Sequence, residues 1–289
     1  MGGPSPRPFS LRGEHSTGEL LEVARLAAAS GAAEVLRRVG NHGEVRTKSS
    51  LTDPVTEADE AAERAIRAVI TEARSDDAIV GEEGGDVEGA SGLRWLVDPL
   101  DGTVNFLYGM PQWSVSVAVA DADGPLVGVV LHPASGEEFS AVRGEQPHLN
   151  GSPFVRRGLH SFSSGAADPL EGVMLATGFN YEREVRVLQG KVFESLVPRV
   201  RDVRRSGSAA LDLCWTAIGR VDAYAEHGVR AWDVSAGALV CTCAGLDVLT
   251  LASGRGWPTG IVAAEGPVAA ALARAFGAES ADWPAAWIN

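Results

Sequence analysis

The sequence predicts a mixed α and β protein whose two halves differ in pattern. In the first half, two helical periodicities are followed by short apolar runs separated by turn residues, which is typical of helices on an antiparallel sheet. In the second half, strand-like and helical patterns alternate, which indicates an α/β arrangement. No Gly/Ser or charged linker and no internal repeat separates the halves. We therefore expect one unit over residues 16–289, with halves of about 16–156 and 157–289.

Two helices open the first half. Apolar residues at helical spacing predict a helix over Gly18–Val39. Thr56 is the expected N-cap of a second helix, and acidic residues, among them Asp59, fill its first turn, where the helix dipole favours them. Four strand-like runs follow, with turn sequences such as "DADG" and "HPASGE" between them, at Arg94–Val97, Trp113–Ala120, Leu126–Leu131 and Glu138–Val142.

The alternating elements of the second half are placed by the same periodicities. Strands are expected near Gly172–Ala176, Val200–Arg204 and Asp222–Glu226. Helices are expected at Arg183–Leu196, Gly207–Ile218 and Trp232–Ala244, and a last strand–helix pair closes the chain.

Composition excludes several classes of function. The net charge of 25 − 38 = −13 argues against a nucleic-acid partner. It also means that an anionic substrate needs a source of positive charge, such as a bound metal ion. No apolar run is long enough to cross a membrane, and residues 1–15 resemble neither a signal peptide nor an anchor, so we expect a disordered tail there. Three clustered cysteines form no disulfide framework, which favours the cytoplasm.

The stretch "WLVDPLDGTVNF" ends an apolar run with two carboxylates, Asp98 and Asp101. A carboxylate in such surroundings is costly unless it is paired or binds a metal. Pro99 fixes the turn between them, and Gly102 allows the backbone to approach a ligand closely. The two acids are therefore expected to converge and to need a divalent cation.

Other acids lie at strand ends or helix starts, where sites commonly form. These are Glu82 and Glu83 in "GEEGG", Asp59, and Asp233 in "AWDVSAG". Taken singly, each is more often a turn or capping residue than a ligand. Together, oxygen ligands without histidine or cysteine favour Mg²⁺ or Mn²⁺ over zinc, and Mg²⁺ commonly acts on phosphates. Backbone N–H groups of Gly102 and Thr103 are placed to receive phosphate oxygens.

These segments resemble the inositol monophosphatase family of Mg²⁺-dependent, lithium-sensitive phosphatases. The stretch "WLVDPLDGTVNF" fits the W-x-x-D-P-[ILV]-D-G-T-x-N-F signature of that family, and "GEE", "KSSLTDPVTEAD", "WDVSAG" and "RRSGSAALDLCWTAIGRVDAYAE" match its other blocks. The resemblance covers roughly Gly18 to the C-terminus. It implies a layered αβαβα fold of the inositol monophosphatase and fructose-1,6-bisphosphatase type, a homodimer, and one catalytic unit over residues 16–289.

The resemblance also implies roles for individual residues. Two or three Mg²⁺ ions, replaceable by Mn²⁺, would be held by Glu82, Asp98, Asp101, Asp233 and the backbone carbonyl of Leu100. Thr103 paired with Asp59 would polarise the attacking water, with Glu82 in the same water network and Glu83 in support. Gly102 and Thr103 would bind the phosphate, and the alcohol pocket would be lined by Gly207, Ser208, Ala209 and Glu226. The implied reaction is in-line attack of metal-activated water on phosphorus.

The natural alcohol is less well specified. The Asn105-Phe106 pair resembles the inositol-1-phosphate branch, while histidinol phosphate, fructose-1,6-bisphosphate and 3′-phosphoadenosine 5′-phosphate are alternatives. A protein-binding regulatory role is the alternative from another class. A dehydrogenase lacks support because no G-x-G-x-x-G follows the first strand. The stretch "AEHGVRAWD" places His227 and Arg230 near the alcohol side of the pocket. Arg230 either contacts a second anionic group of the substrate or points to solvent, and His227 is expected to point to solvent.

Overall fold

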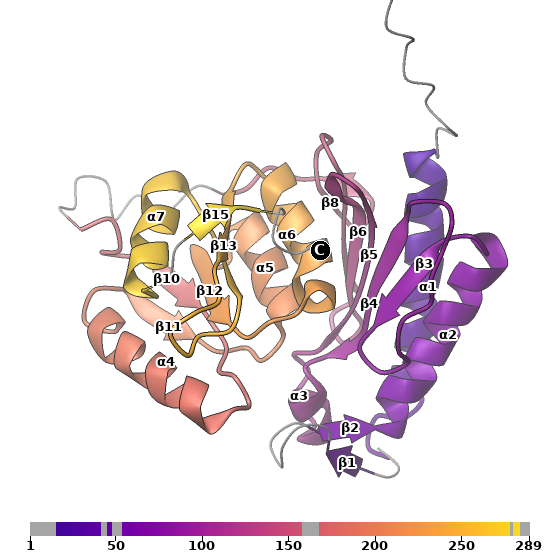
Figure 1. Cartoon of the computed structure of the whole chain (residues 1–289), viewed down its shortest axis with the longest axis horizontal. Helices are drawn as coiled ribbons and strands as arrows, with labels where there is room; N and C mark the ends of the chain where they lie inside the picture. The colour runs from indigo at the N-terminus through magenta and orange to yellow at the C-terminus, as the bar shows by residue number, and fades with distance from the viewer. Residues whose placement is uncertain (1–15, 42–44, 48–53, 158–167, 278–279, 284–289) are drawn as a thin grey trace, which may run out of the picture.

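The computed structural model describes residues 16–41, 45–47, 54–157, 168–277 and 280–283. Two stacked sheets form the body of the molecule, with helices on both outer faces and between them (Figure 1). The helices are α1 Thr17–Leu36, α2 Glu57–Ala73, α3 Thr103–Leu107, α4 Arg183–Leu196, α5 Ala209–Ile218, α6 Ala231–Cys243 and α7 Gly266–Ala275. The expected tail over residues 1–15 lies outside the described residues.

The first sheet has the strand order β3-β4-β5-β6-β7-β8-β9. Every neighbouring pair is antiparallel except β3 and β4, which are parallel. The prediction of an antiparallel sheet is thus confirmed for the four expected strands, β4 Arg94–Asp101, β5 Ser114–Asp121, β6 Gly124–His132 and β7 Glu137–Val142. The sequence prediction missed the short strands β3 Ala78–Gly81, β8 His148–Leu149 and β9 Ser152–Pro153 and the separate pair β1 Val45–Thr47 and β2 Pro54–Thr56.

The second sheet is mixed, with the order β11-β10-β12-β14-β13-β15. Strand β10 pairs in parallel with β11 and β12, and the remaining pairs are antiparallel. Its strands are β10 Met174–Ala176, β11 Asp202–Arg204, β12 Ala223–His227, β13 Asp247–Leu251, β14 Gly260–Ala264 and β15 Ser280–Asp282. The expectation of a single closing strand–helix pair is wrong: the hairpin-like pair β13 and β14 precedes α7, and β15 follows it.

Four clusters of buried apolar residues hold the described part of the chain together. Helices α1 and α2 bury residues such as Ile66 against Trp95 and Val117 of the first sheet. Helices α5 and α6 lie between the sheets, and α4 and α7 cover the outer face of the second sheet (Figure 1). Because both faces of each sheet must be covered to bury their apolar side chains, this order gives the αβαβα layering. The predicted layered fold is confirmed.

The helix starts follow the predicted capping chemistry. The Oγ of Thr56 accepts from the Ala58 N–H at 3.1 Å, and the side chain of Asp59 accepts from the Thr56 N–H at 2.8 Å, which together form a capping box. Each bond satisfies an N–H group that has no partner inside the helix. In the described part of the chain, no helix has both the length and the apolar character that a membrane crossing requires.

Candidate active site

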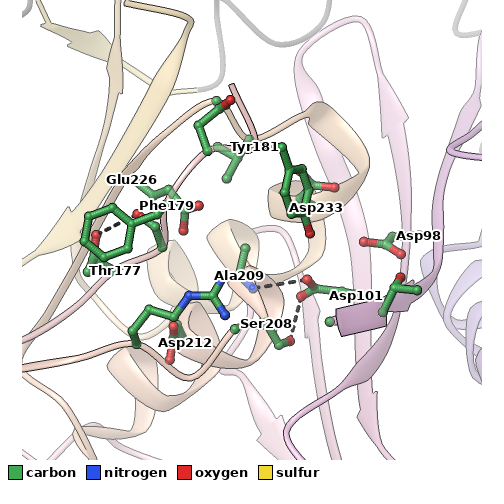
Figure 2. Close-up of a pocket in the computed structure, with 18 of the residues that line it drawn as sticks. Asp98, Asp101, Thr177, Phe179, Tyr181, Ser208, Ala209, Asp212, Glu226 and Asp233 are labelled. Carbon is green, nitrogen blue, oxygen red and sulfur yellow. Dashed lines mark hydrogen bonds between the residues drawn. The ribbon is translucent and has the colours of Figure 1, made fainter. Parts of the chain in front are cut away.

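A cavity of about 120 Å³ lies where the two halves of the chain meet. Strand β4 contributes Asp98 and Asp101 from the first half, and the second half contributes Glu226 and Asp233 (Figure 2). Thr103, at the start of α3, also lines the cavity. Figure 2 shows these carboxylates entering the cavity from opposite walls. Of the residues expected in the site, the cavity is lined by Glu82, Asp98, Leu100, Asp101, Gly102, Thr103, Gly207, Ser208, Ala209, Glu226 and Asp233.

Asp98 and Asp101 both line the cavity, and the register of β4 with β5 is interrupted between them. Asp98 pairs with Ser116 of β5, Asp101 pairs with Ser114, and the register shifts between them. Gly102 then adopts φ 103°, and a Cβ at this position would lie 2.9 Å from the Gln112 carbonyl oxygen. Only glycine fits such a close approach in the left-handed region. The turn therefore starts α3 directly beneath the two aspartates.

Asp101 joins the two halves by capping α5. Its Oδ2 accepts from the Ser208 hydroxyl at 2.6 Å and the Ala210 N–H at 2.7 Å, and its Oδ1 lies 3.2 Å from the Ala209 nitrogen. A carboxylate at a helix N-terminus is stabilised by the free N–H groups and the dipole. Burial nevertheless raises the pKa of Asp101 to about 6, against these hydrogen bonds.

The neighbouring acids repel one another in a poorly solvated space. Burial is the main cause that raises the pKa of Asp98 well above its ordinary range, and the charges of Glu82, Asp101 and Asp233 raise it further. Burial likewise raises the pKa of Asp233, although its Oδ2 accepts from the Arg230 N–H at 2.6 Å. Among the described residues, no Lys, Arg or His forms an ion pair with Asp98, Asp101 or Asp233.

These acids fit a hard divalent cation by donor type and by charge. They offer only oxygen ligands, and a cation would relieve the repulsion that raises their pKa values. No three His, Cys, Asp or Glu side chains in the described ranges are gathered into a ready metal-ligand cluster. In their hydrogen bonds, Asp101 is turned toward the start of α5 and Asp233 toward the start of α6. Metal binding is thus expected to require small rotations of these side chains.

Magnesium is expected to raise the unfolding temperature more at pH 7.5 than at pH 5. The folded-state pKa values of Asp98, Asp101 and Asp233 exceed the ordinary 3.8. Between about pH 4 and these raised pKa values, the folded chain therefore binds more protons than the unfolded chain. Metal-free stability is therefore lost over this range, and a cation restores it once the acids ionise. Thermal unfolding in EDTA and in Mg²⁺ measures the difference, and equal Mg²⁺ shifts at both pH values would contradict the metal site.

Thr103 and Asp59 form a buried pair beside the acids. The Thr103 Oγ1 lies 2.8 Å from Asp59 Oδ1 and 3.1 Å from the carbonyl oxygen of Leu100. The other oxygen of Asp59 accepts from the hydroxyl of Thr56 at 2.6 Å, so the capping box of α2 also holds the pair in place. When the Thr103 proton points to Asp59, the lone pairs of the Thr103 oxygen can accept a hydrogen bond from a water in the cavity.

The opposite wall of the cavity suits hydroxyl groups. The Tyr224 hydroxyl donates to Glu226 Oε2 at 2.8 Å, and burial raises the pKa of Glu226 to about 7. A carboxyl group near its pKa at neutral pH both donates and accepts hydrogen bonds. Gly207, Ser208 and Ala209 approach from the start of α5. Asn105 fastens this segment to α3, because its Nδ2 donates to the carbonyl oxygen of Ser206 at 2.8 Å.

Two expected site residues do not line the cavity: Asp59, which lies behind Thr103, and Glu83. Glu83 instead belongs to a loop that is anchored on α2. Its N–H and that of Gly84 donate to Glu63 of α2 at 2.7 and 2.8 Å, and Glu63 also pairs with Arg67 at 2.7 Å. This anchor positions the loop that presents Glu82, and the sequence prediction missed it. Its only sequence signal is a Glu–Arg pair spaced four residues apart on the second predicted helix.

Sequence patterns also missed one wall of the cavity. Residues 177–181, which connect β10 to α4, line it together with Arg205 and Asp212. Burial raises the pKa of Asp212 well above its ordinary range, and its Oδ1 is buried with no hydrogen-bond partner among the described residues. The segment "TGFNY" carries no catalytic motif, whereas Asp212 gave a weak signal as an acid within an apolar helix.

Comparisons of sequence identify relatives over most of the chain. The sequence profile of the inositol monophosphatase family matches residues 17–281. An inositol-1-monophosphatase SuhB of Mycobacterium tuberculosis is 42% identical over 266 residues, which cover 87% of this chain and 90% of that protein. A Nus factor SuhB of Haemophilus influenzae is 42% identical over 201 residues, covering 69% of this chain and 72% of that protein.

Solved structures agree with these relatives. SuhB of Mycobacterium tuberculosis superposes with a TM-score of 0.74 at 38% identity, covering 91% of this chain and 98% of that one. The extragenic suppressor protein SuhB of Bartonella henselae superposes with a TM-score of 0.78 at 30% identity, covering 89% and 98%. With the profile spanning nearly all of the described residues, the chain belongs to the inositol monophosphatase family.

Proposed function

We propose that this chain is a Mg²⁺-dependent phosphomonoesterase that hydrolyses inositol-1-phosphate or a similar small polyol phosphate. The observation that carries the proposal is the cavity itself, which mutually repelling acids line together with Thr103. The Thr103 hydroxyl lies 2.8 Å from Asp59 Oδ1. Family membership supports a phosphatase, and relatives named inositol-1-monophosphatase support this branch.

In the proposed mechanism, Thr103 and Asp59 orient a water for in-line attack on phosphorus. The Thr103 hydroxyl donates a hydrogen bond to Asp59, and the Thr103 oxygen accepts a hydrogen bond from the water. N–H groups of Gly102 and Thr103 hold the phosphate, while Glu226 exchanges hydrogen bonds with hydroxyls of the alcohol. Residues proposed as ligands of the cation are Glu82, Asp98, Asp101, Asp233 and the carbonyl of Leu100. When bound, Mg²⁺ supplies the positive charge that stabilises the phosphate oxygens and lowers the pKa of water.

A substrate panel tests this proposal. Initial rates of phosphate release with Mg²⁺ would be compared for inositol-1-phosphate, histidinol phosphate, fructose-1,6-bisphosphate, 3′-phosphoadenosine 5′-phosphate and glycerol-2-phosphate, with and without LiCl. Preference for inositol-1-phosphate and inhibition by lithium support the branch. Preference for another compound keeps the phosphatase and changes its substrate.

A protein-binding regulatory role is the second candidate, because some relatives bear the name Nus factor SuhB. Both roles can coexist on one chain. Absence of phosphate release from the whole panel would leave the regulatory role as the better proposal. Direct RNA binding is disfavoured by the net charge of −13. The three free cysteines agree with the proposed cytoplasmic location.

We also propose a homodimer that uses the surface after α3. Tyr108 and Met110, which are separated by Gly109, are 80% and 47% exposed there, which is unusual for two large apolar side chains so close in sequence. Beside them, a cavity of about 460 Å³ is lined by Met110 and Trp215, and the indole N–H of Trp215 is buried with no partner among the described residues.

Met110→Glu is expected to shift the protein from dimer to monomer, because it places a charge within an apolar contact. Sedimentation velocity measures the mass, and Val187→Glu on α4, another exposed apolar position, is the matched control. A monomeric wild-type protein, or equal effects of both variants, would contradict this surface.

A further inference from the structure

A second chamber of about 200 Å³ opens beside the candidate active site. Three residues line both cavities, namely Asn180, Gly228 and Val229. The two spaces therefore meet at these residues. If the alcohol part of the substrate lies at Glu226, a group attached to it can extend into the chamber and stay in contact with the protein.

The passage between the two cavities is set by the backbone. Gly228 has φ 92°, and a Cβ there would lie 1.8 Å from the Nδ2 of Asn180. Asn180 is itself held in place, since its N–H donates to Gln189 Oε1 at 3.0 Å and its Oδ1 accepts from the Glu182 N–H at 2.8 Å. Any larger residue at position 228 would force Asn180 aside, so glycine keeps the passage in its present form.

The far wall of the chamber is rigid. The Trp257 ring stacks on His227 with ring centroids 4.4 Å apart, and His227 Nδ1 lies 2.7 Å from the carbonyl oxygen of Pro258. His227 is fully buried, so the expectation that it points to solvent is wrong. It supports the Trp257 wall from behind and does not line the chamber or the active-site cavity.

Arg230 gives the chamber its cationic group. It lines the chamber at the start of α6, and its side chain is exposed. Its backbone N–H is bound to Asp233, whereas its guanidinium forms no hydrogen bond or ion pair with any described residue. Glu182, at the N-cap of α4, is the other charged residue on the lining.

We propose that Arg230 binds a second anionic group of the substrate in this chamber while the phosphate ester lies at the acids, so that a polyol phosphate with such a group is a better substrate than its counterpart without one. The inference rests on the proposed phosphatase function and extends its substrate class to polyol phosphates with an additional phosphate or carboxylate. The guanidinium is suited to such groups because its N–H donors match two oxygens at once. The chamber is larger than the active-site cavity of about 120 Å³, which leaves room for the extension.

Two substrate pairs that differ by one phosphate test the inference. They are fructose-1-phosphate with fructose-1,6-bisphosphate, and inositol-1-phosphate with inositol-1,4-bisphosphate. For each pair, the ratio of kcat/KM between the bisphosphate and the monophosphate is measured in wild type, Arg230→Gln and Arg255→Gln. Arg255 is an exposed arginine that lies next to the chamber residue Gly256 but does not line the chamber, so its variant controls for the loss of one positive charge.

We expect a ratio above one in the wild type for at least one pair. Arg230→Gln is expected to lower that ratio about tenfold, mainly through KM of the bisphosphate, because the second anion takes no part in bond cleavage. Arg255→Gln should keep the wild-type ratio. A wild-type ratio of one or less, an unchanged ratio in Arg230→Gln, or equal losses in both variants overturns the inference alone. No release from any of the four compounds overturns the proposed function and the inference with it.

Discussion

Asp98→Asn is expected to lower phosphate release at least about a hundredfold, the scale seen when one preorganised electrostatic group is lost. The same variant should raise the unfolding temperature of the metal-free protein. Both effects have one cause: burial and the charges of Glu82, Asp101 and Asp233 disfavour the ionised carboxylate. An amide of equal size removes that repulsion but is a poor ligand for Mg²⁺. The Asp98 Oδ1 accepts from the Leu100 N–H at 3.0 Å, and an asparagine oxygen can replace it.

Activity at saturating Mg²⁺ and thermal unfolding in EDTA are the two measurements. Asp212→Asn is the matched control, because Asp212 is also a buried acid with a raised pKa but is not a proposed metal ligand. It should stabilise the metal-free protein and keep the Mg²⁺-induced rise in unfolding temperature, which Asp98→Asn should lose. Undiminished phosphate release in Asp98→Asn would refute the assignment of this acid to the cation.

Thr103→Ala is expected to reduce kcat by about a hundredfold or more, within the range of a lost general acid–base group. The substitution removes the hydroxyl that lies 2.8 Å from Asp59 Oδ1 and leaves the acids of the cavity in place. Mg²⁺ affinity should therefore change little. Thr103→Ser retains the hydroxyl and should recover most of the activity.

Single-turnover rates and Mg²⁺ titrations separate these effects. Thr216→Ala provides the comparison, because Thr216 is also buried and its hydroxyl donates to the Asp212 carbonyl oxygen at 2.7 Å within α5. Both variants lose the same atoms from a buried hydrogen bond, and only Thr103→Ala should lose turnover. A variant that binds Mg²⁺ weakly but turns over normally at saturation would assign Thr103 to metal binding instead.

The local structure of this chain was predictable because its signals are short in range. The helix expected over Arg183–Leu196 has those bounds, and the capping residue Thr56 starts α2 as expected. Apolar runs bounded by turn residues located β4 to β7, because a strand that is covered on both faces is apolar along most of its length. The short strands β3, β8 and β9 were missed because two to four residues carry too little periodicity to be distinguished from loops.

The sequence by itself determined which residue types gather at strand ends and helix starts, and through its resemblance to a family it determined their expected roles. Only the tertiary structure decided where those residues meet. Asp101 reaches Ser208 across 107 positions in the chain, and Thr103 reaches Asp59 across 44. The tertiary structure also buries His227 behind Trp257 and places Arg230 on the lining of the chamber. Such contacts depend on how two sheets stack around α5 and α6, and no local periodicity encodes that packing.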